Sequence, residues 1–173
     1  ADAVTVMYFE VHDSVPVCKE LVEDRLSPGE TISTALRMAL RHNCRVVGIE
    51  SNAYQYTLNY WFSFICQQMG VIGIEAVELY SGTYSKNSRI MSTFKELMAG
   101  ELLIHPSCTA AVFLQITQFN PLKRDNVDGI LDCLSYAKKM IELYGHYIAS
   151  TLTLEMQEFS AIPVLLEGEN SPF

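Results

Sequence analysis

The sequence predicts a single α/β domain with a mixed β-sheet flanked by helices. The chain has 173 residues, of which 49% are hydrophobic and 18% charged, a composition typical of one globular domain with a sizeable core. Two strand-like segments come first, and strand-like and helix-like segments then alternate. We assign residues 1–159 to this domain and residues 160–173 to a C-terminal tail.

The first half of the chain begins with a predicted β-hairpin. Residues 3–11 and 15–23 are rich in β-forming side chains, and residues 12–14 separate them as a turn. Ser27 and Pro28 then start a predicted helix, since serine caps helices and proline suits the first helical position. Residues 46–50, VVGIE, are a predicted buried strand, and residues 56–70 a helix that ends at Gly70.

The second half continues the alternation. Residues 71–80 are a predicted strand, residues 88–100 a helix ending at Gly100, and residues 101–106 a short strand. Helices follow at 107–118 and 127–144, and residues 146–159 are weakly helical. The apolar stripe of the 127–144 helix consists of Val127, Ile130, Leu131, Leu134, Ala137 and Ile141. The aromatic run at 54–62 is interpreted as packing into the core, not as a stacking platform for bases.

Cysteine usage and charge exclude several functions. The five cysteines are scattered and form no CxxC pair, which indicates reduced thiols in a core, a cytosolic protein and no zinc site. No apolar run reaches the roughly 20 residues of a membrane span, so no membrane partner is expected. The net charge of −8 argues against tight DNA binding by this domain alone. Part of that charge can belong to a metal site, where bound cations neutralise it.

Carboxylates occur at two places where ligands commonly bind. Glu50 ends the VVGIE strand, and ligands collect at the carboxyl ends of strands in open α/β sheets. Asp128 and Asp132 lie one turn apart beside the apolar stripe of the last long helix. Each has a structural alternative: Glu50 as the first solvated residue after a strand, and Asp128 as an acid that favours a helix start. Asp125 is interpreted as such a capping residue.

A strand-end carboxylate and a helix-start carboxylate together suit Mg²⁺ or Mn²⁺, because these hard cations prefer oxygen ligands. Two such ions in a complete site promote phosphodiester hydrolysis by activating water and stabilising the leaving oxygen. Glu50 and Asp128 are therefore the candidate catalytic residues and metal ligands.

Three segments, in this order, resemble the nuclease domain of the large terminase subunit of tailed bacteriophages. They are VVGIESNAYQ (46–55), GTYSKNSRIMSTFKELMAGELLIHP (82–106) and FLQITQFNPLKRDNVDGILDCLSYA (113–137). The resemblance covers residues 2–144 and implies a ribonuclease H-like fold. Glu50 matches the second metal-binding carboxylate of the family, Asp128 the C-terminal one, and Asp132 an acid one turn further on. The resemblance thus implies Asp132 as a further metal ligand with a supporting role.

Two departures from the family pattern matter. The family often has adjacent acids in its last motif, where this chain has Gly129. The first metal-binding aspartate of the family lies on a strand before the hairpin, and we expect the chain to begin after that strand. The expected fold is thus a ribonuclease H-like mixed sheet without its first strand.

Basic residues lie beside the candidate metal ligands. Lys86 and Arg89 lie in and after the loop before the 88–100 helix, and Lys123 and Arg124 precede the Asp128 motif. They are candidates for DNA phosphate contacts without sequence reading, with ordinary surface charge as the alternative. His105, between a strand and a proline, has no specific signal for catalysis.

The resemblance implies a metal-dependent endonuclease that cuts concatemeric double-stranded DNA with little sequence preference. Its implied partners are an N-terminal ATPase motor domain on the same polypeptide, the portal and the small terminase subunit. It would act in the cytoplasm of the infected bacterium, at the procapsid. No GxxxxGK[ST] loop occurs here, so ATP hydrolysis is not expected of these residues. The alternatives are a Holliday-junction resolvase or transposase-like nuclease, and a non-catalytic docking module for the motor or portal.

Overall fold

The structure, a computed structural model, describes residues 2–50 and 55–146. Its strands are β1 (Val4–His12), β2 (Val15–Asp24), β3 (Val46–Glu50), β4 (Glu75–Leu79) and β5 (Leu103–Ile104). Its helices are α1 (Pro28–Arg41), α2 (Gln55–Met69), α3 (Lys86–Met98), α4 (Pro106–Gln118) and α5 (Gly129–Leu134), and residues 137–146 are helical as well. The predicted α/β class is confirmed, whereas the predicted tail at 160–173 lies outside the described residues.

The predicted N-terminal hairpin is present. β1 and β2 pair antiparallel, with a register shift between Tyr8 and Phe9. Asp13 and Ser14 at the turn have φ values of 49° and 64°. This left-handed backbone suits the right-handed twist of the two strands. The bulge brings Glu20 to the face of the hairpin on which α1 lies, where it pairs with Arg41.

The described strands form two sheets where the sequence predicted one. β5 pairs parallel with β2, which gives a three-stranded mixed sheet in the order β1-β2-β5. β3 and β4 pair parallel with each other in a second sheet. The prediction of one sheet is therefore wrong: among the described residues no strand pairs with both β1 and β3, so the two sheets are not joined by hydrogen bonds.

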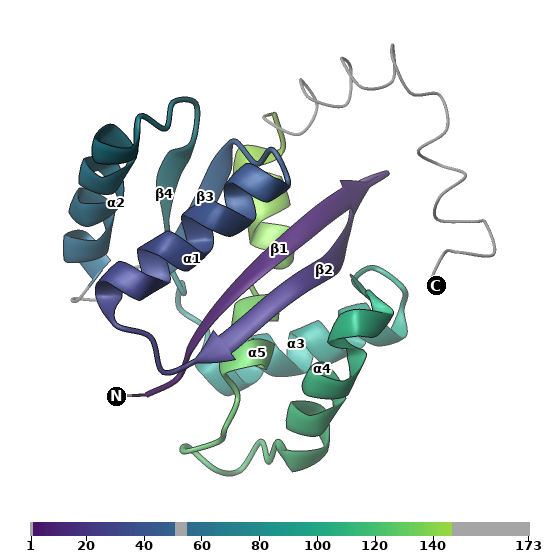
Figure 1. The fold of residues 1–173 in the computed structure, drawn as a ribbon. Coiled ribbons are helices and arrows are strands. Elements are labelled where there is room, and N and C mark those ends of the chain that lie inside the picture. Colours follow the sequence, from purple (N-terminus) through teal and green to yellow (C-terminus); the bar gives the residue numbers. More distant parts are fainter. Residues whose placement is uncertain (1, 51–54, 147–173) are drawn as a thin grey trace.

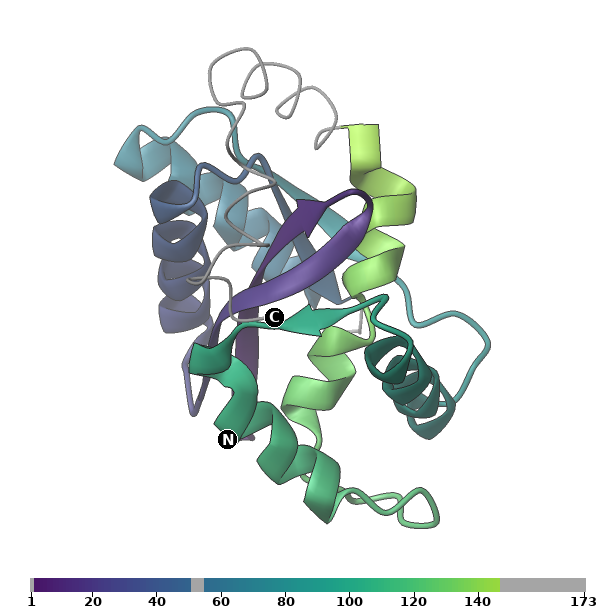
Figure 2. The ribbon, with the colours of Figure 1, turned by 90° about the vertical axis from the view of Figure 1, so that its right-hand side faces the viewer.

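Helices cover both faces of the strands (Figures 1 and 2). On one face α1 and α2 pack on β3 and β4 through a cluster that includes Leu36 and Phe62. On the other face α3, α4 and α5 pack against the hairpin through the larger cluster. The buried members of that cluster are Cys18, Ile90, Leu102, Cys108, Val112, Ile130, Leu131, Leu134 and Ala137. The result is a layer of strands between two layers of helices.

Local sequence signals account for the helix starts. Ser27 caps α1: its hydroxyl accepts a hydrogen bond from the Glu30 amide, and the Glu30 carboxylate accepts one from the Ser27 amide. This reciprocal pair is a capping box, which satisfies two amides that the helix leaves without partners. A local signal also accounts for the end of α3, because Gly100, just beyond that helix, has a φ of 71°. The predicted ends of α2 and α3 are confirmed.

The predicted helix at 127–144 is wrong in two respects. Val127 is 70% exposed and precedes α5, which begins at Gly129. A tight turn at residues 135–136, in which the Tyr136 amide donates to the Cys133 carbonyl, then separates α5 from the helical residues 137–146. β4 is also shorter than predicted, because Gly73, with a φ of 89°, lies before it.

Other expectations are confirmed in part. All five cysteines are free, and Cys18, Cys66 and Cys108 are buried. Phe62 is buried as expected for the aromatic run, but Tyr60 and Trp61 are 67% and 42% exposed, so the core interpretation is wrong for those two. No helix in the described ranges has the length and apolar character needed to cross a membrane.

Candidate functional site

The side chain of Glu50, at the end of β3, points toward the layer that contains α5. Val47 and Ile49 pack against α1 and α2, and side chains alternate along a strand, so Glu50 points to the opposite face. There its Oε1 accepts a hydrogen bond of 2.9 Å from the Tyr136 hydroxyl. Glu50 is 38% exposed. Residues 51–54, which continue the predicted motif, lie outside the described residues.

Asp128 occupies the N-cap position of α5 without capping it. Its side chain makes no hydrogen bond to the amides of its own helix, although it is 4% exposed. Its Oδ1 instead lies 2.5 Å from the Nζ of Lys86, on α3. Asp125, predicted to cap this helix, is exposed and lies outside it, so that prediction is wrong. A capping hydrogen bond therefore does not explain Asp128.

The missing cap of α5 is supplied by a side chain from another helix. Gln115 of α4 is 3% exposed, and its Oε1 accepts from the amides of Ile130 and Leu131 at 2.9 and 3.4 Å. Its Nε2 donates to both carboxylate oxygens of Glu23 on β2, each at 2.9 Å. Because Gln115 satisfies these amides, the Asp128 carboxylate is free to pair with Lys86.

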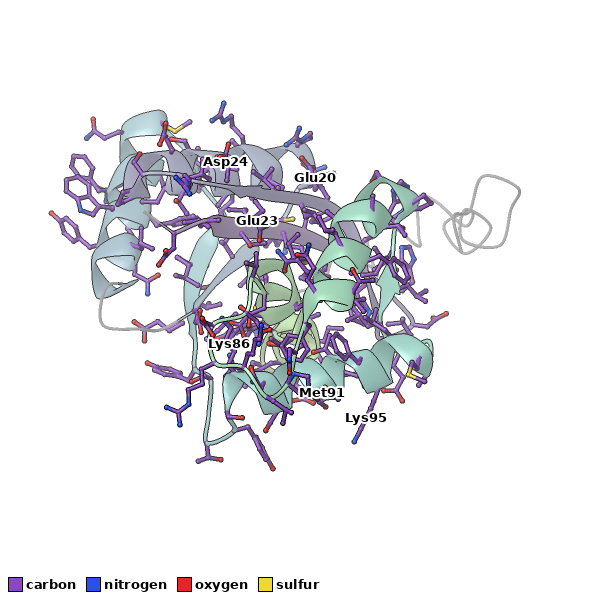
Figure 3. The ribbon with its side chains drawn as sticks, turned by 90° about the horizontal axis from the view of Figure 1, so that it is seen from below. Glu20, Glu23, Asp24, Lys86, Met91 and Lys95 are labelled. Carbon is purple, nitrogen blue, oxygen red and sulfur yellow. The ribbon has the colours of Figure 1, made fainter. Side chains whose placement is uncertain are left out.

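Gly129 lies where α5 meets the hairpin. A Cβ at this position would lie 2.9 Å from Oε2 of Glu23 and 3.0 Å from Oγ1 of Thr5, closer than ordinary contact allows. An acidic side chain here would have to displace the Glu23 carboxylate and the Thr5 hydroxyl. The Glu23 carboxylate, which reaches this position from β2, is labelled in Figure 3.

Asp132 and Arg89 connect the two predicted carboxylates. Nη2 of Arg89 lies 2.6 Å from Oδ1 of Asp132 and 4.0 Å from Oε1 of Glu50. On the other side, Oδ2 of Asp132 is 3.8 Å from the Lys86 ammonium that pairs with Asp128. The structure thus brings five predicted residues into one network of three carboxylates and two cations. Asp132, expected to play a supporting part, is its centre.

Aromatic and thiol groups complete the surroundings. The guanidinium of Arg89 lies 5.2 Å from the centre of the Tyr136 ring, within the range of a cation–π contact. Burial raises the pKa of the Tyr136 hydroxyl, and its hydrogen bond to Glu50 raises it further. Burial, followed by the charges of Asp132, Glu50 and Glu23, raises the pKa of Cys133 to about 12. Both groups are therefore protonated near neutral pH.

The other two predicted basic residues lie in an adjoining groove. Lys123 and Arg124 line, together with Lys86, a groove of about 680 Å³ between α3 and residues 121–124. Among the described residues, neither forms an ion pair with the three carboxylates. His105, which has no specific sequence signal for catalysis, caps α4 by accepting a hydrogen bond from the Ser107 amide.

Sequence reasoning missed Glu23, Gln115 and Tyr136. Gln115 carried a usable signal: on α4 it follows the buried Cys108 and Val112 at seven and three residues, so it occupies an apolar-periodic position. A buried polar residue requires hydrogen-bond partners. No local pattern marks Glu23 or Tyr136, because their partners are distant in sequence.

The donor chemistry of the site fits a hard divalent cation. Glu50, Asp128 and Asp132 offer carboxylate oxygens, which Mg²⁺ and Mn²⁺ prefer, and an ammonium group already lies between two of them. Such a bridging cation marks a position of negative potential. A metal ion there would replace Lys86 as the partner of the carboxylates. Within residues 2–50 and 55–146, no three His, Cys, Asp or Glu side chains surround a common metal position.

Comparisons with known proteins do not place the chain in a family. No model of a known protein family matches the sequence, and no curated protein matches it either.

Proposed function

We propose that this chain is a divalent-metal-dependent DNA endonuclease domain of the type found in tailed-phage large terminase subunits. The observation that carries the proposal is the state of Asp128, a buried carboxylate at a helix start that leaves its own helix amides to Gln115. Asp128 shares an ion network with Asp132, on the same helix, and with Glu50, at the end of β3. Three carboxylates this close need cations beside them, a requirement that Lys86 and Arg89 meet here and that a divalent ion would meet in the proposed site.

The arrangement of the strands supports a ribonuclease H-like fold within this proposal. Among the described residues, β1 pairs on one side only, with β2, and β3 pairs only with β4. α1 contacts both β1 and β3. A strand that paired with both β1 and β3 would join the two sheets into one. Two sheets separated in this way are the arrangement expected for a ribonuclease H-like sheet without its first strand.

Each group of residues in the site would have its own role. Glu50, Asp128 and Asp132 would hold Mg²⁺ or Mn²⁺, two ions in the complete site, and the bound metal would supply activation of water and stabilisation of the leaving oxygen. Lys86 and Arg89 would neutralise phosphate charge beside the carboxylates. Tyr136 orients Glu50 through its hydrogen bond.

The proposal extends to the biological setting. The substrate is concatemeric double-stranded DNA, cut with little sequence preference in an infected bacterium during filling of the procapsid. The partners are an ATPase motor domain on the same polypeptide, the portal and the small terminase subunit. The net charge of −8 favours help from such a partner in holding DNA.

The test combines calorimetry with cleavage of linear duplex DNA, using the full chain. We expect Mn²⁺ to bind and to support cleavage, and expect Glu50→Gln and Asp128→Asn each to reduce cleavage at least a hundredfold. Glu20→Gln is the matched control, because Glu20 is also a strand carboxylate paired with an arginine but lies on the face covered by α1. Thermal melts establish that each variant is folded.

One observation favours a second candidate, a non-catalytic docking module. Lys86 and Arg89 already pair with the carboxylates, so a structural role as an ion-pair network is self-consistent. If the folded chain binds no Mn²⁺ and leaves DNA intact, the nuclease proposal is wrong and the docking module is favoured.

A further inference from the structure

The groove beside the carboxylates concentrates positive charge in an acidic protein. Four of the twelve Lys and Arg residues of the chain line it, namely Lys86, Lys95, Lys123 and Arg124. None of the twenty Asp and Glu residues is among its described lining residues. The net charge of the chain is −8, so evenly distributed charges would place acidic residues in the groove as well. A surface with charge of one sign favours a ligand of the opposite sign.

The two walls of the groove are fixed to each other. The side-chain amide of Asn87, on α3, donates to the carbonyls of Pro121 and Lys123, both at 2.9 Å. The amide of Asn126 donates to the same Lys123 carbonyl at 3.1 Å and to that of Asn120 at 2.9 Å. These four bonds hold the opposite wall in place, so a ligand would meet a groove that is already formed.

Three of the four cations have no carboxylate partner among the described residues. Lys95, Lys123 and Arg124 are exposed and form no ion pair there. Lys86 differs, because its ammonium contacts Asp128 at one end of the groove. Figure 3 shows Lys86, Met91 and Lys95 following one another along α3. The groove therefore leads away from the carboxylates along that helix.

We propose that this groove binds the phosphate backbone of one nucleic-acid strand, with Lys95 as the contact most distant from the carboxylates. Lys86 and Lys95 are nine residues apart, which corresponds to about 13 Å of helix, or about four nucleotides at the rise of one strand. Hydroxyls of Ser88 and Ser92 line the groove as further donors to phosphate. The choice of nucleic acid as the polyanion rests on the proposed function.

The lining also suits the remainder of a nucleotide. Met91 is 39% exposed and Leu122 93% exposed, and both line the groove. Apolar surface beside unpaired cations fits a ligand that alternates charged phosphates with sugars and bases. An acidic peptide offers carboxylates but lacks the flat apolar rings, so the nucleic acid is the better match.

The experiment measures binding of a fluorescent twelve-nucleotide oligo(dT) to the full chain by anisotropy, in EDTA, at several salt concentrations. Four phosphate contacts on a single strand predict a slope of log K against log salt of about −2.8, or a loss of affinity of about 50-fold between about 50 and 200 mM salt. Lys95→Gln and Lys123→Gln should each make the slope shallower by about 0.7. Arg37→Gln, which removes an exposed cation on α1, should leave it unchanged.

Two results would overturn the proposal. One is a slope that Lys95→Gln and Arg37→Gln change equally. The other is displacement of the oligonucleotide by poly-glutamate as efficiently as by unlabelled oligo(dT) at the same charge concentration. EDTA removes metal, so binding and cleavage are tested separately. If Lys95→Gln makes the salt slope shallower but Mn²⁺ supports no cleavage, the nuclease proposal is wrong and the groove proposal stands. If Mn²⁺ supports cleavage but Lys95→Gln leaves the salt slope unchanged, only the groove proposal is wrong.

Discussion

Replacing Gln115 with leucine tests how the start of α5 is held. The change leaves the buried amides of Ile130 and Leu131 without an acceptor and removes both amide hydrogen bonds to Glu23. A buried polar group without a partner costs about 1–3 kcal/mol, and the bond to Leu131 is long, at 3.4 Å. Apolar burial of the leucine offsets part of the loss. We expect a net destabilisation of about 3 kcal/mol, which corresponds to a decrease in Tm of about 6–12 °C.

Gln115→Glu separates the electrostatic part of this effect. The glutamate keeps an acceptor for the Ile130 amide but places a second carboxylate against Glu23. Repulsion between the two raises their folded-state pKa above the unfolded value of about 4.3. A raised folded-state pKa gives stability that is present below the unfolded value and lost as the pH rises through the folded one. The variant should therefore be much closer to the unmodified chain at about pH 5 than at about pH 8.

Urea unfolding followed by far-UV circular dichroism measures both variants. Gln118→Leu and Gln118→Glu are the matched controls, because Gln118 is an exposed glutamine on the same helix. The reasoning is refuted if Gln115→Leu is as stable as Gln118→Leu. It is also refuted if the deficit of Gln115→Glu is the same at both pH values.

Three further predictions concern packing, capping and thiol reactivity. Gly48→Ala should lower the free energy of unfolding by about 1–3 kcal/mol, because its Cβ would lie 2.5 Å from Met140 Sδ and 2.6 Å from Leu79 Cδ1. Urea denaturation measures the loss. A Gly48→Ala chain as stable as the original would contradict the prediction. Ser27→Ala removes half of the capping box of α1 and should cost about 1 kcal/mol, seen as a lower Tm. Cys133, whose pKa is raised to about 12, should react with iodoacetamide at about pH 8 far more slowly in the native chain than in urea. Peptide mass spectrometry measures the two rates, and equal rates would contradict the raised pKa.

Local elements could be predicted because their causes lie within a few residues. The capping box at Ser27, the hairpin turn at Asp13 and Ser14, and the helix ends before Gly70 and Gly100 all depend on neighbouring residues. The strand-end position of Glu50 belongs to the same class. For these elements, periodicity and turn chemistry were sufficient.

Long-range pairings could not be predicted from one sequence. Lys86 meets Asp128 across 42 residues of chain, a pairing that no local pattern encodes. The capping of α5 by Gln115, fifteen residues earlier in the chain, is likewise a tertiary contact. The candidate carboxylates were found because of their residue type, whereas the network that joins them was visible only in the folded chain.

The shortness of α5 has a consequence for when the candidate site exists. A helix of six residues is far below the length that persists unaided in water, so α5 depends on α4, the hairpin and α3 to form. Asp128 and Asp132 therefore acquire their positions only after those elements have docked. The site should be among the last parts of the domain to assemble during folding, and partly folded chains would carry its acids without the arrangement that could use them.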